Sequence, residues 1–272
     1  MSLSVIPKKS LGQNFLNSQR VISRIVESAE LSQSDIVLEI GPGLGAITEK
    51  LLLSAGKVVA VEKDRELYAI LEKKFEKNIQ NKQFELIQGD IMQFDPEIIK
   101  KNKGFTYKIA ANIPYNITGL IIRKFLTAPY QPKVMVLLVQ KEVADRIVAH
   151  DKKESLLSLS VKAYGSVKKI TNVARGNFNP PPRVDSAVIK IDSISREHFP
   201  KPELEELFFK IIHAGFAHKR KVLLKNLVDA HIADKKLLTE IFNKRNLLAT
   251  IRSEDLTLED WIFITKLLYT NH

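Results

Sequence analysis

The chain contains no cysteine. It therefore has no disulfide framework, no thiolate nucleophile and no cysteine ligand for a metal ion. Its six histidines show no ligand-like spacing, so we expect no metal site. No apolar run approaches the length of a membrane span, and the N-terminus lacks the apolar core of a signal peptide. These absences predict a cytoplasmic protein with no membrane partner.

Acidic residues are few relative to basic ones. The 31 Asp and Glu against 42 Lys and Arg give a formal net charge of +11 at pH 7. An excess of this size favours a polyanionic partner, because basic side chains that neutralise phosphates release counterions. A soluble enzyme acting on a small metabolite has no need of such an excess of positive charge. A merely solvated lysine-rich surface is the alternative, and it applies even to the cluster Lys219-Arg220-Lys221.

Three of the eleven glycines lie in one short stretch. The apolar run at residues 36–40 is typical of a strand buried on both faces of a parallel sheet. Gly41, Gly43 and Gly45 follow it, and the pattern becomes helical from Ala46. Glycines let the backbone turn sharply and approach a ligand closely. The stretch predicts a nucleotide-like cofactor at the carboxyl end of a strand, against a helix N-terminus.

This stretch alone does not identify the cofactor. Gly41, Gly43 and Ala46 satisfy the dinucleotide fingerprint, and Glu62 is placed to hold the ribose of NAD. Gly45 and Glu39 favour S-adenosylmethionine instead. A purely structural glycine turn is a third alternative, so the identity of the cofactor depends on other parts of the chain.

The rest of the N-terminal part alternates strand and helix. This alternation predicts a mostly parallel, doubly wound α/β sheet. Glu62, Asp90 and Asn112 each follow a strand end, so we expect them on the same rim as the glycines. Ser18 is a candidate cap for a helix with apolar residues at positions 21–29. The expected strands are residues 36–40, 57–61, 84–87, 107–111 and 134–139.

The pattern changes in the last third of the chain. Residues 169–174 and 184–191 predict an antiparallel hairpin that ends the sheet, and a charged, proline-bearing segment at 195–202 resembles a linker. Only helical patterns follow, the last beginning near Thr257 with Asp260 as a cap partner. We therefore expect a cofactor-binding domain at 1–195 and a helical domain at 196–272.

The tetrapeptide Asn112-Ile113-Pro114-Tyr115 indicates the chemistry. Pro114 restricts the backbone of Ile113, so the Ile113 carbonyl and the Asn112 side-chain oxygen form two fixed acceptors beside an aromatic ring. The exocyclic amine of adenine needs two acceptors under a stacked ring. Positioning and preorganised dipoles can then activate this weak nucleophile without a strong base. The alternative is a common Asn-X-Pro turn after a strand.

In chain order, several motifs resemble those of the ribosomal RNA adenine dimethyltransferases. They are Gln13–Leu16, Glu39–Gly45, Glu62, Gly89-Asp90, Asn112–Tyr115 and Phe178–Ser186. The resemblance covers nearly the whole chain. It implies a Rossmann-like S-adenosylmethionine-dependent methyltransferase fold with a small C-terminal all-helical domain.

The resemblance also implies site residues. Asn14 and Leu16 would close over S-adenosylmethionine, Gly41 and Gly43 would lie beneath it, Glu62 would hold its ribose and Asp90 its adenine edge. Asn112 would also belong to the cofactor site. Catalysis would depend on Asn112 and the Ile113 carbonyl, fixed by Pro114, to hold the target amine. Tyr115 and Phe178 would stack the adenine, which must leave its helix to meet the methyl group.

The C-terminal residues resemble the branch of the family that dimethylates two adjacent adenosines near the 3′ end of small-subunit rRNA. Arg220-Lys221 and Arg252-Ser253-Glu254 carry this likeness, although Lys219 stands where Arg is common. The implied partner is small-subunit rRNA within a partly assembled subunit, bound by a monomer through Lys219, Arg220 and Lys221. Two rivals remain, an NAD-dependent oxidoreductase and a non-catalytic RNA-binding assembly factor.

Overall fold

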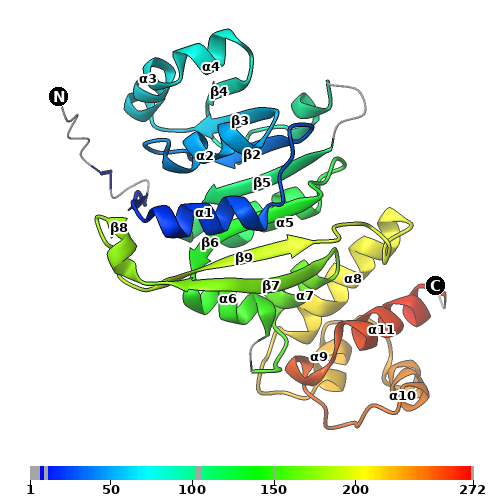
Figure 1. The fold of residues 1–272 in the computed structure, drawn as a ribbon. Helices are drawn as coiled ribbons and strands as arrows, with labels where there is room; N and C mark the ends of the chain where they lie inside the picture. Colours follow the sequence, from blue (N-terminus) through cyan, green and yellow to red (C-terminus); the bar gives the residue numbers. More distant parts are fainter. Residues whose placement is uncertain (1–6, 9–11, 102–105, 150, 271–272) are drawn as a thin grey trace. The chain divides into compact units, whose positions relative to one another are not determined.

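Among the residues that the structure describes, seven strands form one sheet in the computed structural model (Figure 1). The described residues are 7–8, 12–101, 106–149 and 151–270. The strand order is β4-β3-β2-β5-β6-β9-β7, parallel from β4 to β6, with β9 antiparallel to both neighbours. The strands are β2 Ile36–Ile40, β3 Lys57–Glu62, β4 Phe84–Gln88, β5 Tyr107–Asn112, β6 Val134–Gln140, β7 Ser166–Val173 and β9 Ser186–Asp192.

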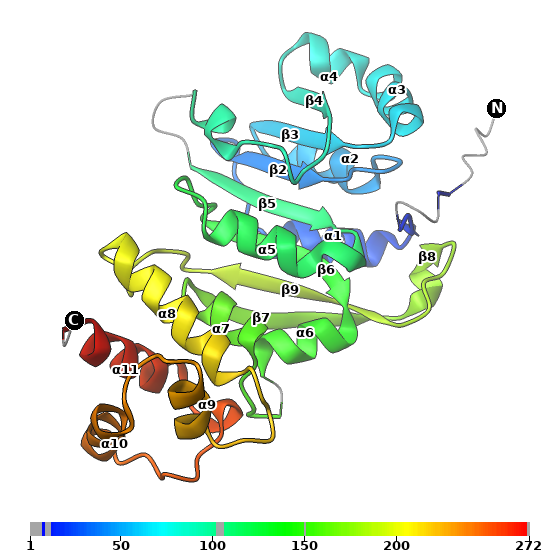
Figure 2. The same cartoon turned by 180° about the vertical axis from the view of Figure 1, so that it is seen from behind.

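The central strands are buried because helices cover both faces of the sheet. Every residue of β2 is buried, as its unbroken apolar run predicts. Figure 1 shows helices α1 and α2 in front of the sheet, and Figure 2 shows α5 on the opposite face. The doubly wound sheet with a terminal antiparallel hairpin is confirmed. The helices of this part are α1 Gln19–Ser28, α2 Ala46–Ser54, α3 Arg65–Lys74, α4 Glu76–Gln80, α5 Thr118–Leu126 and α6 Lys141–Val148.

The strand order reverses direction between β2 and β5. From β2 the chain proceeds outward to β3 and β4, and it then returns to β5 on the other side of β2. In open α/β sheets, ligands bind outside the carboxyl ends of the strands at such a switch point. The topology therefore predicts a ligand site between the loop after β2 and the residues after β5.

A second, two-stranded sheet lies near the carboxyl ends of the parallel strands. β1, Phe15–Leu16, pairs antiparallel with β8, Phe178–Asn179. The backbone N–H of Asn17 also donates to the carbonyl of Asn177 at 3.0 Å. The pairing joins segments more than 160 positions apart in sequence, and no local pattern announces it. It holds the described residues before α1 against the loop between β7 and β9.

The chain divides into two compact units, one of 1–144 and 166–194 and the other of 145–165 and 195–272. The described elements of the second unit are helical: α7 Leu156–Lys162, α8 Pro202–Gly215, α9 Leu223–Asp229, α10 Lys235–Lys244 and α11 Leu258–Thr270. Trp261 and Phe208 are fully buried at its centre. The backbone N–H of Thr257 donates to Asp260 at 3.0 Å, as the expected cap requires.

The expected domains, 1–195 and 196–272, differ from these units in one respect. Residues 145–165 group with the C-terminal helices, because Tyr164 packs against the rings of Phe199 and Phe209. Phe199 lies in the segment expected to be a linker, yet it is only 4% exposed. None of the described helices combines the length and apolar character needed to cross a membrane.

Candidate active site

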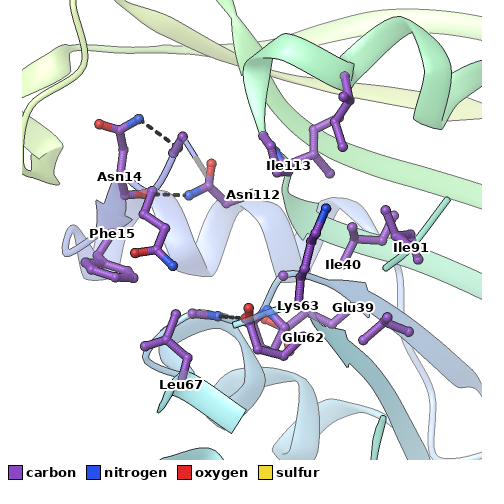
Figure 3. Close-up of a pocket in the computed structure, with 18 of the residues that line it drawn as sticks. Asn14, Phe15, Glu39, Ile40, Glu62, Lys63, Leu67, Ile91, Asn112 and Ile113 are labelled. Atoms are coloured by element: carbon purple, nitrogen blue, oxygen red, sulfur yellow. Dashed lines mark hydrogen bonds between the residues drawn. The ribbon is translucent and has the colours of Figure 1, made fainter. Parts of the chain in front are cut away.

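A cavity of about 230 Å³ lies at the carboxyl ends of β2, β3, β4 and β5. Its walls are the segment 12–16, the loop after β2, and the residues that follow the other three strands. Figure 3 shows Asn14 and Asn112 on one side of this cavity and Glu62 with Leu67 on the other. The predicted rim residues Glu62, Asp90 and Asn112 therefore come together here.

The glycine loop after β2 has the left-handed backbone that glycine permits. Gly41, Gly43 and Gly45 have φ values of 62°, 62° and 80°. A Cβ on Gly45 would lie 2.6 Å from the ring of Phe75, so this glycine is required for packing. A Cβ on Gly41 would meet no atom within 4 Å, because Gly41 borders the cavity. Gly45 therefore shapes the loop, whereas Gly41 leaves space beside it.

Glu62, at the end of β3, closes the glycine loop. Its carboxylate accepts a hydrogen bond from the backbone N–H of Gly43 at 3.1 Å (Figure 3) and another from the backbone N–H of Asp64 at 2.9 Å. Burial raises the pKa of Glu62, although both hydrogen bonds oppose the shift. A carboxylate has about four lone-pair sites, so two donors leave acceptor capacity for hydroxyl groups of a ligand. This geometry suits a ribose.

Glu39 is a second buried carboxyl group on the cavity wall. It is 1% exposed, and the hydroxyl of Thr48 donates to it at 2.6 Å. Burial raises the pKa of Glu39 to about 8, and the charge of Glu62 adds to the shift. At neutral pH the protonated form of Glu39 therefore predominates. A neutral carboxyl group can donate as well as accept a hydrogen bond.

Asp90 follows β4 and pairs with a lysine that the sequence analysis did not identify. The Lys63 ammonium lies 2.8 Å from the Asp90 carboxylate, and the backbone N–H of Met92 donates to it at 2.9 Å. The hydrogen bond from Lys63 lowers the pKa of Asp90, which keeps this carboxylate charged. Lys63 directly follows Glu62, so its place after a strand end was the available signal. Both side chains line the cavity.

Asn112 has a fixed amide orientation. Its Nδ2 donates to the backbone carbonyl of Asn14 at 3.0 Å (Figure 3). Because the nitrogen is engaged with segment 12–16, the side-chain oxygen is the atom left to accept from a ligand. The side chain of Asn14 donates to the carbonyl of Gly12 at 3.2 Å, so Asn14 acts on Asn112 through its backbone.

The residues after Asn112 are also held by specific contacts. Ile113 is 1% exposed, and Pro114 has φ −60° and ψ 129°, which directs the chain into a short turn, η3 Tyr115–Ile117. The Tyr115 hydroxyl and the Ser186 hydroxyl are hydrogen-bonded at 2.6 Å. Burial raises the pKa of Tyr115, so the phenol stays neutral. The contact to β9 fixes the ring at the cavity wall.

Phe178 is the one expected base-stacking residue that the structure does not bring to the cavity. It is 3% exposed and belongs to the hydrophobic core, opposite Leu16 in the β1–β8 ladder. Leu16 lines the cavity, whereas Phe178 does not. Phe178 is therefore placed as the strand partner of Leu16 within the core. Its stacking role stays a prediction, one that requires the ring to become exposed.

Asp64 connects the segment before α1 to the start of α3. Its carboxylate accepts from Lys8 Nζ at 2.9 Å, Gln13 Nε2 at 2.8 Å and the backbone N–H of Glu66 at 2.9 Å. Burial alone would raise the pKa of Asp64, but these hydrogen bonds outweigh it and lower the pKa. Asp64 also caps α3. No sequence pattern indicates Asp64 as part of the site.

The basic cluster Lys219-Arg220-Lys221 lies in the second unit, in the connection between α8 and α9, and its side chains are exposed. Asn226 Nδ2 donates to the carbonyls of Gly215 at 2.6 Å and His218 at 3.2 Å. Buried Asn226 thereby fixes the start of this connection. Within the described part of the chain, no group of histidine or acidic residues could hold a metal ion.

Comparisons with known proteins identify relatives of the whole chain. The family described as ribosomal RNA adenine dimethylase matches residues 7–268. Ribosomal RNA small subunit methyltransferase A of Dehalococcoides mccartyi (strain CBDB1) is 43% identical over 93% of this chain and 86% of its own length. The protein of the same name from Clostridium botulinum (strain Langeland) is 36% identical, over 96% and 94%.

Solved structures share the fold. A dimethyladenosine transferase from Plasmodium falciparum superposes with a TM-score of 0.78 at 28% identity, covering 94% of this chain and 97% of that one. The 23S rRNA methyltransferase ErmE gives a TM-score of 0.76 at 23% identity, covering 94% and 100%. The second likeness concerns the fold alone. The expected methyltransferase fold is confirmed.

Proposed function

Since the chain belongs to the ribosomal RNA adenine dimethylase family, we propose that it transfers two methyl groups from S-adenosylmethionine to the exocyclic amine of adenosine in small-subunit rRNA. The observation that carries this proposal is the oriented amide of Asn112 at the cavity wall. An NAD-dependent oxidoreductase would have no use for such an acceptor beside Pro114 and Tyr115. The small-subunit branch is supported by the names of the relatives that are 35–43% identical.

We assign the cofactor to the cavity beside the glycine loop. The residues present fit S-adenosylmethionine: Gly41 leaves open space, Glu62 retains acceptor capacity for ribose hydroxyls, and Asp90 can accept from an adenine amine. Asn14, Leu16 and Gly43 complete the proposed cofactor site from the other walls of the cavity. When bound there, S-adenosylmethionine supplies an electrophilic methyl group.

The protein's own contribution is to hold and orient the amine. The Asn112 oxygen and the Ile113 carbonyl would accept its two hydrogens, which directs the nitrogen lone pair away from the ring. Pro114 fixes the carbonyl, and Tyr115 offers a ring held by Ser186 on which the adenine can stack. Once methylated, the nitrogen is strongly acidic and loses a proton to water. Preorganised dipoles account for the activation, and no strong base is required.

The substrate we propose is the pair of adjacent adenosines near the 3′ end of small-subunit rRNA, within a partly assembled subunit. The net charge of +11 and the exposed Lys219, Arg220 and Lys221 support a polyanionic substrate. Their role in RNA binding, the monomeric state and the cytoplasmic location stay predictions.

One experiment tests this function. Unmethylated small subunits are incubated with the protein and methyl-labelled S-adenosylmethionine, and their rRNA is digested and analysed by mass spectrometry. We expect labelled N6,N6-dimethyladenosine at two neighbouring positions. A protein that binds the subunits but transfers no label would be an assembly factor instead. Calorimetry that gave heat with NAD and none with S-adenosylmethionine would overturn the cofactor assignment.

A further inference from the structure

A second depression lies beside the segment that enters α1. It is an open groove of about 550 Å³ between the N-terminal turns of α1 on one side and the end of β7 with its connection to β8 on the other. Its polar lining residues are Ser18, Arg20, Arg24, Thr171, Asn172 and Asn177. All belong to the first unit. The groove shares no residue with the cavity described above.

The groove carries positive charge without a matching negative charge. None of the described residues that line it is acidic. Arg20 is exposed, and no acidic group pairs with it within the described part of the chain. Arg24 has one contact, 3.7 Å from Glu27, between side chains that are 57% and 63% exposed. Such exposed ion pairs contribute little to stability, so an external anion can readily replace Glu27 as the partner of Arg24. Both guanidinium groups can therefore take an external anion.

The helix end in this groove adds to the attraction for an anion. Ser18 occupies the N-cap position of α1, yet its side chain makes no capping hydrogen bond. The first turn of α1 contains no acidic residue. Its backbone N–H groups and the positive end of the helix dipole therefore complement the two arginines. On the opposite wall Asn172 presents an exposed amide group, whereas the Thr171 hydroxyl and one amide hydrogen of Asn177 are donated to the carbonyls of Asn172 and Ala174.

The groove adjoins the candidate active site through the chain itself. Leu16 lines the cavity and Ser18 lines the groove, and these residues are two positions apart, at most about 7 Å of extended chain. On the opposite wall, Asn177 precedes Phe178, which pairs with Leu16. The β1–β8 ladder is therefore the partition between the two depressions. A chain that placed one nucleotide in the cavity would bring its neighbours to this partition.

We propose that this groove binds the phosphates of nucleotides flanking the target adenosine. The inference rests on the proposed function, because it requires RNA at the cavity. An arginine guanidinium can donate two parallel hydrogen bonds to one phosphate. The groove is open and polar, which suits binding of the RNA backbone through phosphate contacts and without contacts to the bases. The groove sets the register of the substrate and does not touch the reacting atoms.

The test removes the two charges and compares the result with a matched loss of charge elsewhere. Arg20→Gln/Arg24→Gln is compared with Lys73→Gln/Lys77→Gln, whose exposed lysines on α3 and α4 line neither depression. The probe is a transcript of the 3′-terminal region of small-subunit rRNA, titrated at several salt concentrations. Calorimetry with S-adenosylmethionine serves as the folding and cofactor control.

We expect the arginine pair to weaken RNA binding about tenfold and to reduce the salt slope by about 1.4 to 1.8, the value for two lost phosphate contacts. The lysine pair should change both far less, and cofactor affinity should stay at the wild-type value in both variants. Equal salt slopes for the two variants would overturn the groove assignment. If the wild-type protein itself neither binds nor methylates this RNA, the proposed function fails instead.

Discussion

Asn112 donates its amide hydrogen to the carbonyl of Asn14, 98 positions earlier in the chain, at 3.0 Å. This bond gives one end of the Asn112 amide a partner within the protein and leaves the other end for a ligand. The orientation of this acceptor therefore depends on the position of segment 12–16.

Replacement of Asn112 tests its catalytic role. In Asn112→Ala we expect methyl transfer to fall by about two to three decades, by analogy with the loss of one preorganised polar group. The affinity for S-adenosylmethionine should change far less. Single-turnover rates and calorimetric Kd values separate the two effects. A variant with nearly the wild-type rate would remove Asn112 from catalysis.

Tyr115 can be divided into its ring and its hydroxyl. Tyr115→Phe keeps the ring and loses the contact to Ser186, so we expect a destabilisation of about 1 kcal/mol and a small loss of rate. Tyr115→Ala also loses the stacking surface, which is worth about 1–3 kcal/mol per base, or roughly 5- to 150-fold in RNA affinity. Urea unfolding and RNA titration measure the two quantities. Equal RNA affinities of the two variants would argue against stacking on Tyr115.

The buried carboxyl of Glu39 predicts a pH dependence of stability. Its pKa is raised to about 8, whereas a free Glu has the usual 4.5. Between these values the folded state holds a proton that the unfolded state has lost. The stabilising contribution is therefore complete below pH 4.5 and is lost as the pH rises through 8, with a slope of at most about 1.4 kcal/mol per pH unit.

Glu39→Gln removes this titration and keeps an acceptor for Thr48. We expect its unfolding free energy to fall less steeply between about pH 5 and pH 8 than that of the wild-type protein. Urea unfolding at several pH values gives both slopes. The idea fails if the two slopes coincide, since the titration would then belong to other groups.

Two glycines of one loop should respond differently to the same change. Gly45→Ala places a Cβ 2.6 Å from the ring of Phe75, so we expect the protein to lose about 3 kcal/mol of stability. Gly41→Ala meets no atom within 4 Å, and its stability cost should be only the left-handed strain of about 1–2 kcal/mol. Its main effect should be weaker binding of S-adenosylmethionine, because the new methyl group enters the cavity. Melting temperatures measure the stability of both variants, and calorimetry measures their affinity for S-adenosylmethionine.

The sequence was most informative where structure is local. The apolar run of β2 and the helical spacing after Ala46 depend only on neighbouring residues, and both are confirmed. Three strand ends could also be assigned to one rim, because parallel strands share a direction. Glu62, Asp90 and Asn112 do line one cavity.

Contacts between distant segments could not be predicted from the sequence. The pairing of Leu16 with Phe178 is a tertiary choice, and it is the reason that Phe178 is buried instead of facing the cavity. The ion pair between Lys63 and Asp90 likewise depends on adjacent strands β3 and β4. The grouping of residues 145–165 with the C-terminal helices depends in the same way on partners of Tyr164 that lie beyond position 195.

Residues 12–14, which precede the β1–β8 pairing, have two attachments that affect turnover: Gln13 to Asp64 at the start of α3, and the carbonyl of Asn14 to Asn112. Dimethylation consumes two molecules of S-adenosylmethionine, so spent cofactor must be exchanged for fresh between the first transfer and the second. If that stretch lies over the cofactor, exchange lifts it away and releases the Asn112 amide at the same time. The amine must then be bound by Asn112 a second time, so singly methylated adenosine should accumulate briefly before the doubly methylated product.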